Sequence, residues 1–594
     1  MGAADDGFVR RLREAVSLAD RGELPAAIER LRALLREQPR AASLRQLLAR
    51  CHLRAGERDA ALAIAAHPSV LADRATLYAM VADFADAGAG RERVALLEAV
   101  VRHDPSDYEA ALALAASLHA LGCPSAALRW STHASSLRPR APLPRAIAAT
   151  ALVDRGDVEA GLAAYRDLLA THADAEHAAR HLVLMHYDPA LDAPAMSAAI
   201  NAFARRFLPR PDRIEARARL PGQRLRIGWV SPRFGDGPVP TFLGGLLRAF
   251  DRERHEHVLV DLAATDRRLA HSLLREGDAY VDASGLGDEA LLVRLRALEL
   301  DVLVDLAGHS TANRLAVIAR RAAPVQLTWL DWFDTTGVAA IDAFVGDPWI
   351  MPPGSDAHFS ETVANLPSGR FCYTPPHDAI EVSRVGDGAV VFASFNRLAK
   401  LNDGVLDAWA AILLCCPDSR LVLRARHLGE ADTRAHVAAR LGARGVDASR
   451  LELGGPLPYR DLLDAYRRVD IALDPFPFSG CTTSCDALWM GCAVVAIEGN
   501  TYVGRQSASL LRRLGAIEWI ASDAAGYVEC ARRAAADVPA LRGARAALRR
   551  RVLECLCDAR THADEFARLV HALAQGSIVT RPSPVTRGSI GDPT

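Results

Sequence analysis

The sequence predicts an all-α helical repeat followed by two α/β lobes, each built on a doubly wound parallel sheet. Four observations support this fold class. The chain has 594 residues, more than a single hydrophobic core of about 250 residues accommodates. Glycines recur at a nearly fixed interval through its first third, and short apolar runs alternate with helical stretches from Leu225 onward. Hydrophobic residues make up 50% and charged residues 24% of the chain, as in a folded globular protein.

The repeat is predicted over residues 1–210. Its glycines lie 34, 32, 34 and 34 residues apart, at Gly22, Gly56, Gly88, Gly122 and Gly156. Prolines follow three of them at an offset of 17 residues. A glycine between two helices and a proline before the next pair are typical of tetratricopeptide repeats. Stacked helix pairs form a concave groove. The groove suits an extended peptide or protein partner; the alternative is a spacer that binds nothing.

The first α/β lobe is predicted over residues 222–376. Buried strands are indicated at four apolar runs: Leu225–Val230, Val258–Leu262, Val302–Leu306 and Val325–Leu330. A helical stretch at Leu291–Leu300 separates two of these runs. Alternation of strands and helices at this spacing is typical of a parallel sheet.

The second lobe is predicted over residues 385–576. Its strands are expected at Val390–Ser394, Leu421–Leu423, Leu451–Leu453, Ile471–Leu473 and Ala493–Ile497. Helices follow at Gly404–Leu414 and Gln506–Leu514, and a last helical region spans Leu541–Leu573. Residues 577–594 are rich in Pro, Ser, Thr and Gly and are predicted to be a disordered tail. Two doubly wound units in tandem bind ligands at the carboxyl ends of their strands.

Composition excludes several classes of function. The formal net charge is -1, without the basic excess that a general nucleic-acid binder carries. No apolar stretch approaches the ~18 residues of a membrane span, and the first ten residues do not resemble a signal peptide. The 11 cysteines include no C-x-x-C pair, which favours free thiols over a disulfide framework or a zinc site. We therefore expect a cytoplasmic protein with neither nucleic acid nor membrane as partner.

Lys400 is the single lysine among 71 basic residues. It lies in the loop that follows the predicted strand Val390–Ser394. Lysine presents a compact ammonium, whereas arginine presents a wide planar fork. A lysine kept at a strand end therefore indicates a position that needs a point charge, such as a phosphate contact. The alternative is chance survival of one surface lysine.

A second group of polar residues surrounds a predicted helix start near Thr482. Gly480, Cys481, Thr482 and Thr483 follow a strand and a Pro/Gly loop, and Asp486 lies one helical turn further on. Hydroxyl side chains here either cap free backbone N–H groups or, with the helix dipole, bind an anion. Asp486 either accepts hydrogen bonds from ribose hydroxyls or favours the dipole. Together with Lys400, the helix start describes a site for a nucleoside diphosphate.

Six segments resemble glycosyltransferase family 41, the protein O-GlcNAc transferases and plant Spindly-type proteins. The segments are Phe395–Lys400, Gly480–Gly491, Gly228–Pro232, Asp305–His309, Ala323–Trp329 and Thr335–Gly337. The similarity runs from Leu225 to Leu573 in the expected order, behind a tetratricopeptide array that the family also has. The resemblance implies a catalytic region of the GT-B type. It also implies inverting transfer of a sugar from a nucleoside diphosphate to Ser or Thr hydroxyls of proteins, with the repeat array binding the acceptor.

The resemblance also implies roles for individual residues. Lys400 would stabilise the leaving diphosphate, and Asp486 would hold the ribose. The phosphates would be lined by Gly480, Cys481, Thr482 and Thr483, with Arg397 and Arg505 as further candidates. Candidate bases are His309 and Asp236, although a histidine after a strand is as often a structural hydrogen-bond donor. No Asp-x-Asp motif is present to hold a divalent ion on the donor, so neither a metal nor another cofactor is expected.

Departures from the family leave alternatives open. Gly237 stands where family members have a cleft histidine, and Cys481 stands where the better-known O-GlcNAc transferases have His. Ala399 and His309 resemble the Spindly branch, whose plant members use GDP-fucose. We therefore weigh three functions: a protein O-glycosyltransferase that uses UDP-GlcNAc, one that uses GDP-fucose, and a scaffold whose transferase region has decayed.

Overall fold

The computed structural model describes residues 3–214, 222–235, 237–263, 267–376, 380–386 and 388–576. Asp236 and the predicted tail 577–594 lie outside the described residues. The chain divides into two compact units. One contains residues 1–155 with 163–168 and 429–433, and the other contains the rest. The domain limits expected from the sequence remain a proposal, because the units divide at Arg155 and not near residue 210.

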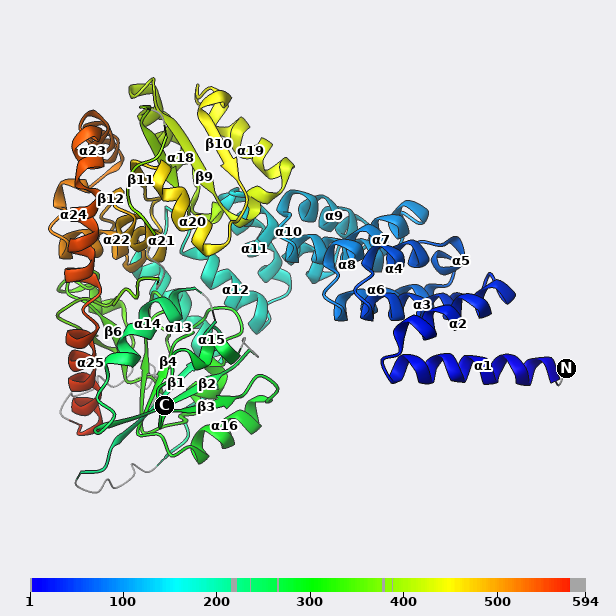
Figure 1. Cartoon of the computed structure of the whole chain (residues 1–594). Coiled ribbons are helices and arrows are strands. Elements are labelled where there is room, and N and C mark those ends of the chain that lie inside the picture. Colours follow the sequence, from blue (N-terminus) through cyan, green and yellow to red (C-terminus); the bar gives the residue numbers. More distant parts are fainter. Residues whose placement is uncertain are drawn as a thin grey trace, which may run out of the picture. The chain divides into compact units, whose positions relative to one another are not determined.

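The N-terminal helices form pairs with the predicted period, and Figure 1 shows them in blue to cyan. Their bounds are α1 (Ala3–Asp20), α2 (Leu24–Glu37), α3 (Ala42–Arg54), α4 (Arg58–Ala65), α5 (Pro68–Leu71), α6 (Arg74–Asp86), α7 (Gly90–His103), α8 (Tyr108–Ala120), α9 (Pro124–Leu137), α10 (Pro142–Arg155) and α11 (Val158–Thr171). Each periodic glycine lies between two helices with φ between 62° and 98°. A residue with a Cβ rarely adopts this left-handed conformation, which explains the fixed glycine period.

Two further helices, α12 (Ala175–Met185) and α13 (Ala193–Phe207), follow the repeat. The repeat pattern fades after Leu182 because these helices bury a different face. Met196, Ile200 and Phe203 of α13 pack with Leu182 and with Trp332 of the first lobe. The two helices therefore pack against the first lobe.

The first lobe is built on seven parallel strands within the described residues, in the order β3-β2-β1-β4-β5-β6-β7. The strands are β1 (Leu225–Ser231), β2 (His255–Asp261), β3 (Ala279–Asp282), β4 (Val302–Asp305), β5 (Val325–Thr328), β6 (Ala343–Gly346) and β7 (Thr362–Asn365). Its helices include α14 (Pro238–Ala249), α15 (Arg267–His271), α16 (Asp288–Ala297) and α17 (Leu315–Ala319). The four strands predicted from apolar runs are present. The other three, β3, β6 and β7, were not predicted, and β3 and β7 are short and partly polar.

The second lobe is built on six described strands, in the order β10-β9-β8-β11-β12-β13, and all pairs are parallel. The strands are β8 (Val391–Ser394), β9 (Arg420–Arg424), β10 (Leu451–Gly454), β11 (Ile471–Leu473), β12 (Ala493–Ile497) and β13 (Ile520–Ala521). Its helices are α18 (Asp403–Cys415), α19 (Ala431–Gly442), α20 (Tyr459–Ala465), α21 (Thr482–Trp489), α22 (Tyr502–Arg513) and α23 (Ala524–Ala536). Both sheets reverse their strand order beside the first strand, so the predicted fold class of two doubly wound lobes is confirmed.

The last two helices, α24 (Val538–Leu556) and α25 (Ala559–Ala574), run from the second lobe to the first and appear orange and red in Figure 1. Helix α24 contacts α21 and α22, whereas α25 packs on α14. Phe566 of α25 lies with its ring centroid 5.4 Å from Trp229 and 5.0 Å from Trp329. The predicted helical region Leu541–Leu573 therefore consists of two helices that join both sheets.

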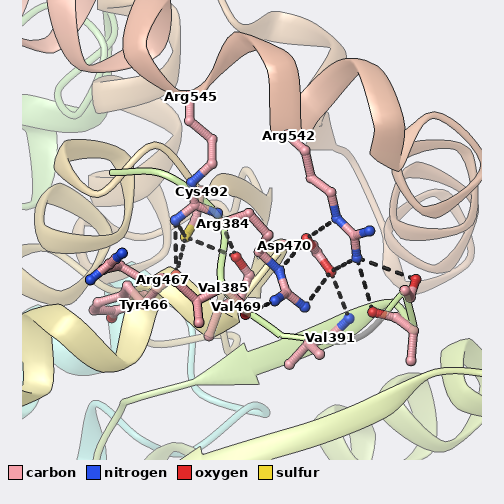
Figure 2. A network of polar contacts seen from close by, with 12 residues as sticks. Arg384, Val385, Val391, Tyr466, Arg467, Val469, Asp470, Cys492, Arg542 and Arg545 are labelled. Atoms are coloured by element: carbon pink, nitrogen blue, oxygen red, sulfur yellow. Dashed lines mark hydrogen bonds and ion pairs between the residues drawn. The ribbon is translucent and has the colours of Figure 1, made fainter. Parts of the chain in front are cut away.

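Asp470 fixes α24 to the second sheet, as Figure 2 shows. Its carboxylate accepts hydrogen bonds from Arg542 Nε at 2.8 Å, Arg384 Nε at 2.9 Å and the Val391 backbone at 3.0 Å. Burial opposes ionisation, but the hydrogen bonds from Arg542 and Arg384 outweigh it and lower the pKa of Asp470. The neighbouring Arg545 donates to the Val469 carbonyl at 2.7 Å. This polar network holds α24 against the start of β11.

Among the described residues, no helix combines the length and apolar character needed to cross a bilayer.

Candidate functional site

A cavity of about 320 Å³ lies where loops from the carboxyl ends of both sheets meet. The loops follow β1, β4 and β5 in the first lobe, and β8 and β11 in the second. Strand order reverses between β1 and β4 and between β8 and β11, which is where doubly wound folds bind ligands. Its polar lining residues are Arg233, Ser310, Thr311, Asp331, Asn396, Arg397, Lys400, Ser479, Cys481, Thr482, Thr483 and Gln506.

Lys400 lines this cavity, at the end of a short 3₁₀ turn that follows β8. Its Nζ donates to the Ser479 carbonyl at 2.8 Å and to Asn396 Oδ1 at 3.1 Å, and it lies 4.6 Å from the Phe478 ring centroid. Burial lowers the pKa of Lys400 to about 8, although the nearby Asp474 carboxylate opposes the shift. The ammonium form therefore still dominates at pH 7, and its position is fixed before any ligand binds.

The start of α21 forms the adjoining wall. The Gly480 N–H donates to Asp474 Oδ1 at 2.7 Å, and a Cβ at Gly480 would lie 2.3 Å from Ser484 Oγ. Glycine is therefore required for this close approach. Thr483 Oγ1 donates to Asn396 Oδ1 at 3.1 Å, whereas the buried Thr482 hydroxyl has no hydrogen-bond partner in the described structure. Since buried hydroxyls are normally satisfied, the bare Thr482 hydroxyl points to a ligand.

Asp474 interacts with both Gly480 and Lys400, through a hydrogen bond and through its charge. It was not among the predicted site residues. Burial raises its pKa to about 6, and the Lys400 ammonium opposes that shift. Its Oδ2 has no hydrogen-bond partner within the described residues. A carboxylate directly after a buried strand is the sequence signal that could have identified it.

Asp486 and Arg505 do not line the cavity. Asp486 Oδ1 accepts hydrogen bonds from Tyr373 at 2.8 Å and Tyr459 at 2.9 Å, and burial raises the pKa of this carboxyl to about 6. The Arg505 guanidinium donates to three backbone carbonyls, among them that of Gly499 at 3.0 Å. Both side chains have protein partners in this conformation.

His309 also lies outside the cavity lining and is buried beside Trp332. Its Nε2 is 2.8 Å from the Thr336 carbonyl. Because a carbonyl only accepts, this nitrogen carries the proton. Burial lowers the pKa of His309 to about 4, so the ring is neutral at pH 7. This geometry favours the structural hydrogen-bond donor that the sequence left open.

Gly237 lines the cavity directly before α14, with φ of 85°. This left-handed conformation is unfavourable for histidine, the residue whose place Gly237 takes according to the family resemblance. The chain therefore cannot place a histidine side chain at this point without changing the backbone.

The first-lobe wall carries charged residues that motif comparison did not identify. Arg233 follows β1, and Asp331 follows β5. Arg233 Nε lies 3.5 Å from Asp331 Oδ2. Burial raises the pKa of Asp331, and the charges of Arg233 and Arg397 oppose the shift. Their common signal is position: each lies a few residues beyond the end of a buried strand.

Comparisons with known proteins agree with this architecture. Residues 209–380 and 377–566 match the family model described as glycosyl transferase family 41. The solved structure of a mutant Thermobaculum terrenum O-GlcNAc transferase is 32% identical and covers 84% of this chain and 97% of its own, with a TM-score of 0.76. A Petunia hybrida protein named probable UDP-N-acetylglucosamine–peptide N-acetylglucosaminyltransferase SPINDLY is 33% identical over 348 residues. An Arabidopsis thaliana protein of the same name is 32% identical over 337 residues.

These matches differ in extent. The similarity covers 57% of this chain and 37% of the Petunia protein, and 55% of this chain and 37% of the Arabidopsis protein. The chain thus spans little more than a third of the length of these curated relatives.

Proposed function

Because the chain belongs to glycosyl transferase family 41, as its motifs predict, we propose that it is an inverting protein O-glycosyltransferase. It transfers GlcNAc from UDP-GlcNAc to Ser or Thr hydroxyls of a protein. The observation that carries this proposal is a single cavity lined by two groups. One is the Lys400 ammonium, which the protein holds in place, and the other is the Thr482 hydroxyl at the start of α21, which has no hydrogen-bond partner among the described residues. A cation beside a helix N-terminus is a site for phosphate.

The charge of the cavity supports a diphosphate ligand. Three cations (Arg233, Arg397 and Lys400) and one carboxylate (Asp331) line it. The net charge of these side chains is +2. It balances a diphosphate, because each of the two phosphates of a nucleotide sugar carries one negative charge.

Lys400 acts on the leaving group. When the bond between the anomeric carbon and the diphosphate breaks, negative charge grows on the diphosphate oxygen. The ammonium is already oriented by Ser479 and Asn396, so it stabilises that charge without reorganisation.

The α21 start, with Cys481, Thr482 and Thr483, binds the phosphates together with Arg397. We propose that Asp486 binds the ribose and that Arg505 binds a phosphate. For this, each side chain must first break a hydrogen bond that it now makes within the protein. His309 acts through Thr336, holding the loop beside Trp332.

We propose that transfer needs no metal ion, because these side chains supply the positive charge that a divalent ion provides elsewhere. Among the described residues there is no cluster of three His, Cys, Asp or Glu side chains that could hold a metal. Transfer rates should be unchanged by excess EDTA. A loss restored by Mg²⁺ or Mn²⁺ would overturn metal independence.

The repeat array is proposed to bind the acceptor protein. A groove of about 570 Å³ in the N-terminal unit is lined by α6, α7, α8 and α10. Apolar side chains such as Val81, Leu112 and Ile147 line it together with Arg74 and Glu109. The first helices of successive repeats contribute nearly all of these residues. An extended peptide segment with mixed apolar and charged side chains fits such a surface.

We place the activity in the cytoplasm. All 11 cysteines are free thiols, which a reducing compartment maintains.

A thermal-shift panel tests the donor. A ligand that binds only the folded state raises the melting temperature with the logarithm of its excess over Kd. We expect shifts with UDP and UDP-GlcNAc and none with GDP or GDP-fucose. Shifts with guanosine ligands alone would replace the donor by GDP-fucose. No shift with any nucleotide would favour the scaffold.

A further inference from the structure

Asp331 lies on the cavity wall formed by the first lobe, in a segment whose backbone is fixed by its neighbours. It follows β5 in the segment 329–332, whose backbone is held by the fully buried Arg370. Arg370 donates to the carbonyls of Leu330 at 3.3 Å and Trp332 at 2.9 Å, on either side of Asp331. Leu330 has φ of 66°, a conformation that non-glycine residues rarely adopt and that the surroundings must enforce. The carboxylate is therefore held in place by a rigid backbone.

Asp331 is also the single carboxylate among the lining residues, all of which belong to the described part of the chain. Its Oδ2 lies 3.5 Å from Arg233 Nε, and only 14% of its side chain is exposed. The charged groups that interact with it are Arg233 after β1, Arg397 after β8 and the buried carboxyl of Asp305 at the end of β4, and Lys400 lines the same cavity. Burial raises the pKa of Asp331, and the charges of Arg233 and Arg397 oppose this shift.

The geometry of an inverting transfer requires the acceptor oxygen to enter opposite the leaving group. Lys400 and the start of α21, which hold the leaving diphosphate in the proposed function, come from the second sheet. A group that takes the acceptor proton must then belong to the other wall, which the first sheet builds. Among the lining residues of that wall, Asp331 carries the one carboxylate, the group there whose chemistry suits it to take a proton from a hydroxyl.

We propose that Asp331 is the general base of the transfer, an inference that rests on the proposed function. The acceptor oxygen forms a bond with the anomeric carbon, and the bond to the diphosphate oxygen breaks with its electron pair. The hydroxyl proton moves to the Asp331 carboxylate and is later released to water. This assignment fills the role for which Gly237 provides no side chain. His309 does not line the cavity, and its Nε2 already donates to the Thr336 carbonyl.

The first test separates catalysis from binding. Asp331→Asn should lower kcat for a peptide acceptor about 10²- to 10⁴-fold, with the Kd of UDP-GlcNAc unchanged within twofold. Asp331→Glu, which keeps the carboxylate, should retain more activity than Asn. The matched control is Asp282→Asn, an exposed aspartate at the end of β3 in the same sheet, which should transfer at the wild-type rate.

The second test uses a readout that a merely structural role does not move. In Asp331→Ala, exogenous formate should restore part of the transfer rate, because a small carboxylate can occupy the vacated space. The acidic limb of the kcat/KM profile should disappear in Asp331→Asn, since that limb reports protonation of the base.

Three results would overturn the inference. These are wild-type kcat in Asp331→Asn, a loss confined to donor Kd, or a retained acidic limb without formate rescue. A loss confined to donor Kd would mean that Asp331 binds a sugar hydroxyl. Failure of the proposed function is recognised separately, because wild-type protein would then neither bind a nucleoside diphosphate nor transfer sugar.

Discussion

Lys400 is the residue whose chemical identity matters most for the proposed transfer. Its ammonium fits between the Ser479 carbonyl and the Phe478 ring, where a guanidinium is too wide. Lys400→Arg should therefore lower kcat at least about 100-fold, a typical cost of losing one preorganised donor. The melting temperature should stay within about 2 °C of wild type. Transfer to a peptide and a thermal melt measure the two effects, and an active Arg variant would refute the requirement for a point charge.

The pKa of Lys400 also predicts a pH dependence. Burial lowers the pKa to about 8, so the free protein loses this cation as the pH rises through that value. On the alkaline side of the profile, the kcat/KM for the donor should fall about tenfold per pH unit above the lowered pKa of Lys400. In Lys400→Met the residual rate should show no such limb. A wild-type profile that stays flat to pH 9.5 would contradict the assignment.

At this scale the sequence predicts residues that belong to motifs and misses residues that function through position. Lys400 and Thr482 were identified because one is the single lysine and the other begins a helix after a glycine loop. Asp331 was not, since its only signal is its place beyond β5. Asp486 was predicted as a ribose ligand, but its hydrogen bonds to two tyrosines come from segments distant in the sequence.

Among the elements, α24 depends on a carboxylate at the start of β11. Asp470→Asn leaves Arg384, whose side chain is 9% exposed, and Arg542 without their anion. We expect this variant to lose about 3 kcal/mol of unfolding free energy at pH 7. Because the folded pKa of Asp470 lies below its ordinary value of 3.8, the stabilisation is full above that value and declines as the pH falls through the folded pKa.

Urea unfolding followed by circular dichroism at pH 7 measures this effect. The exposed Asp418→Asn is the control and should change the midpoint little. Equal midpoints for the two variants would show that the network does not secure α24. The sequence identified the helix through its periodicity, but not this contact, because Asp470 and Arg542 are distant along the chain.

For the whole molecule, local patterns predict much of the architecture. The glycine period identifies the repeats because each repeat needs a left-handed turn. Alternating apolar runs identify the lobes because parallel strands are buried on both faces. The strands β3, β6, β7 and β13 did not emerge in this way. β3 and β7 are partly polar, and β13 has only two residues. Which loops share a cavity follows only from the strand order, which no local pattern encodes.

The two compact units are proposed to divide the work between acceptor binding and chemistry, and this division can be tested in the full chain. Ala116 lies exposed on α8 and lines the groove of the repeat unit. Ala116→Arg would place a long cation where the acceptor segment lies. We expect the KM for a protein acceptor to rise about tenfold, the equivalent of 1.4 kcal/mol of binding free energy. The KM for a short peptide that does not reach the groove should not change, because the cavity with Lys400 is unaltered.

Ala26→Arg, at an exposed position of α2 outside the groove lining, is the matched control. An equal loss with protein and short peptide would mean that the repeat array does not select the acceptor.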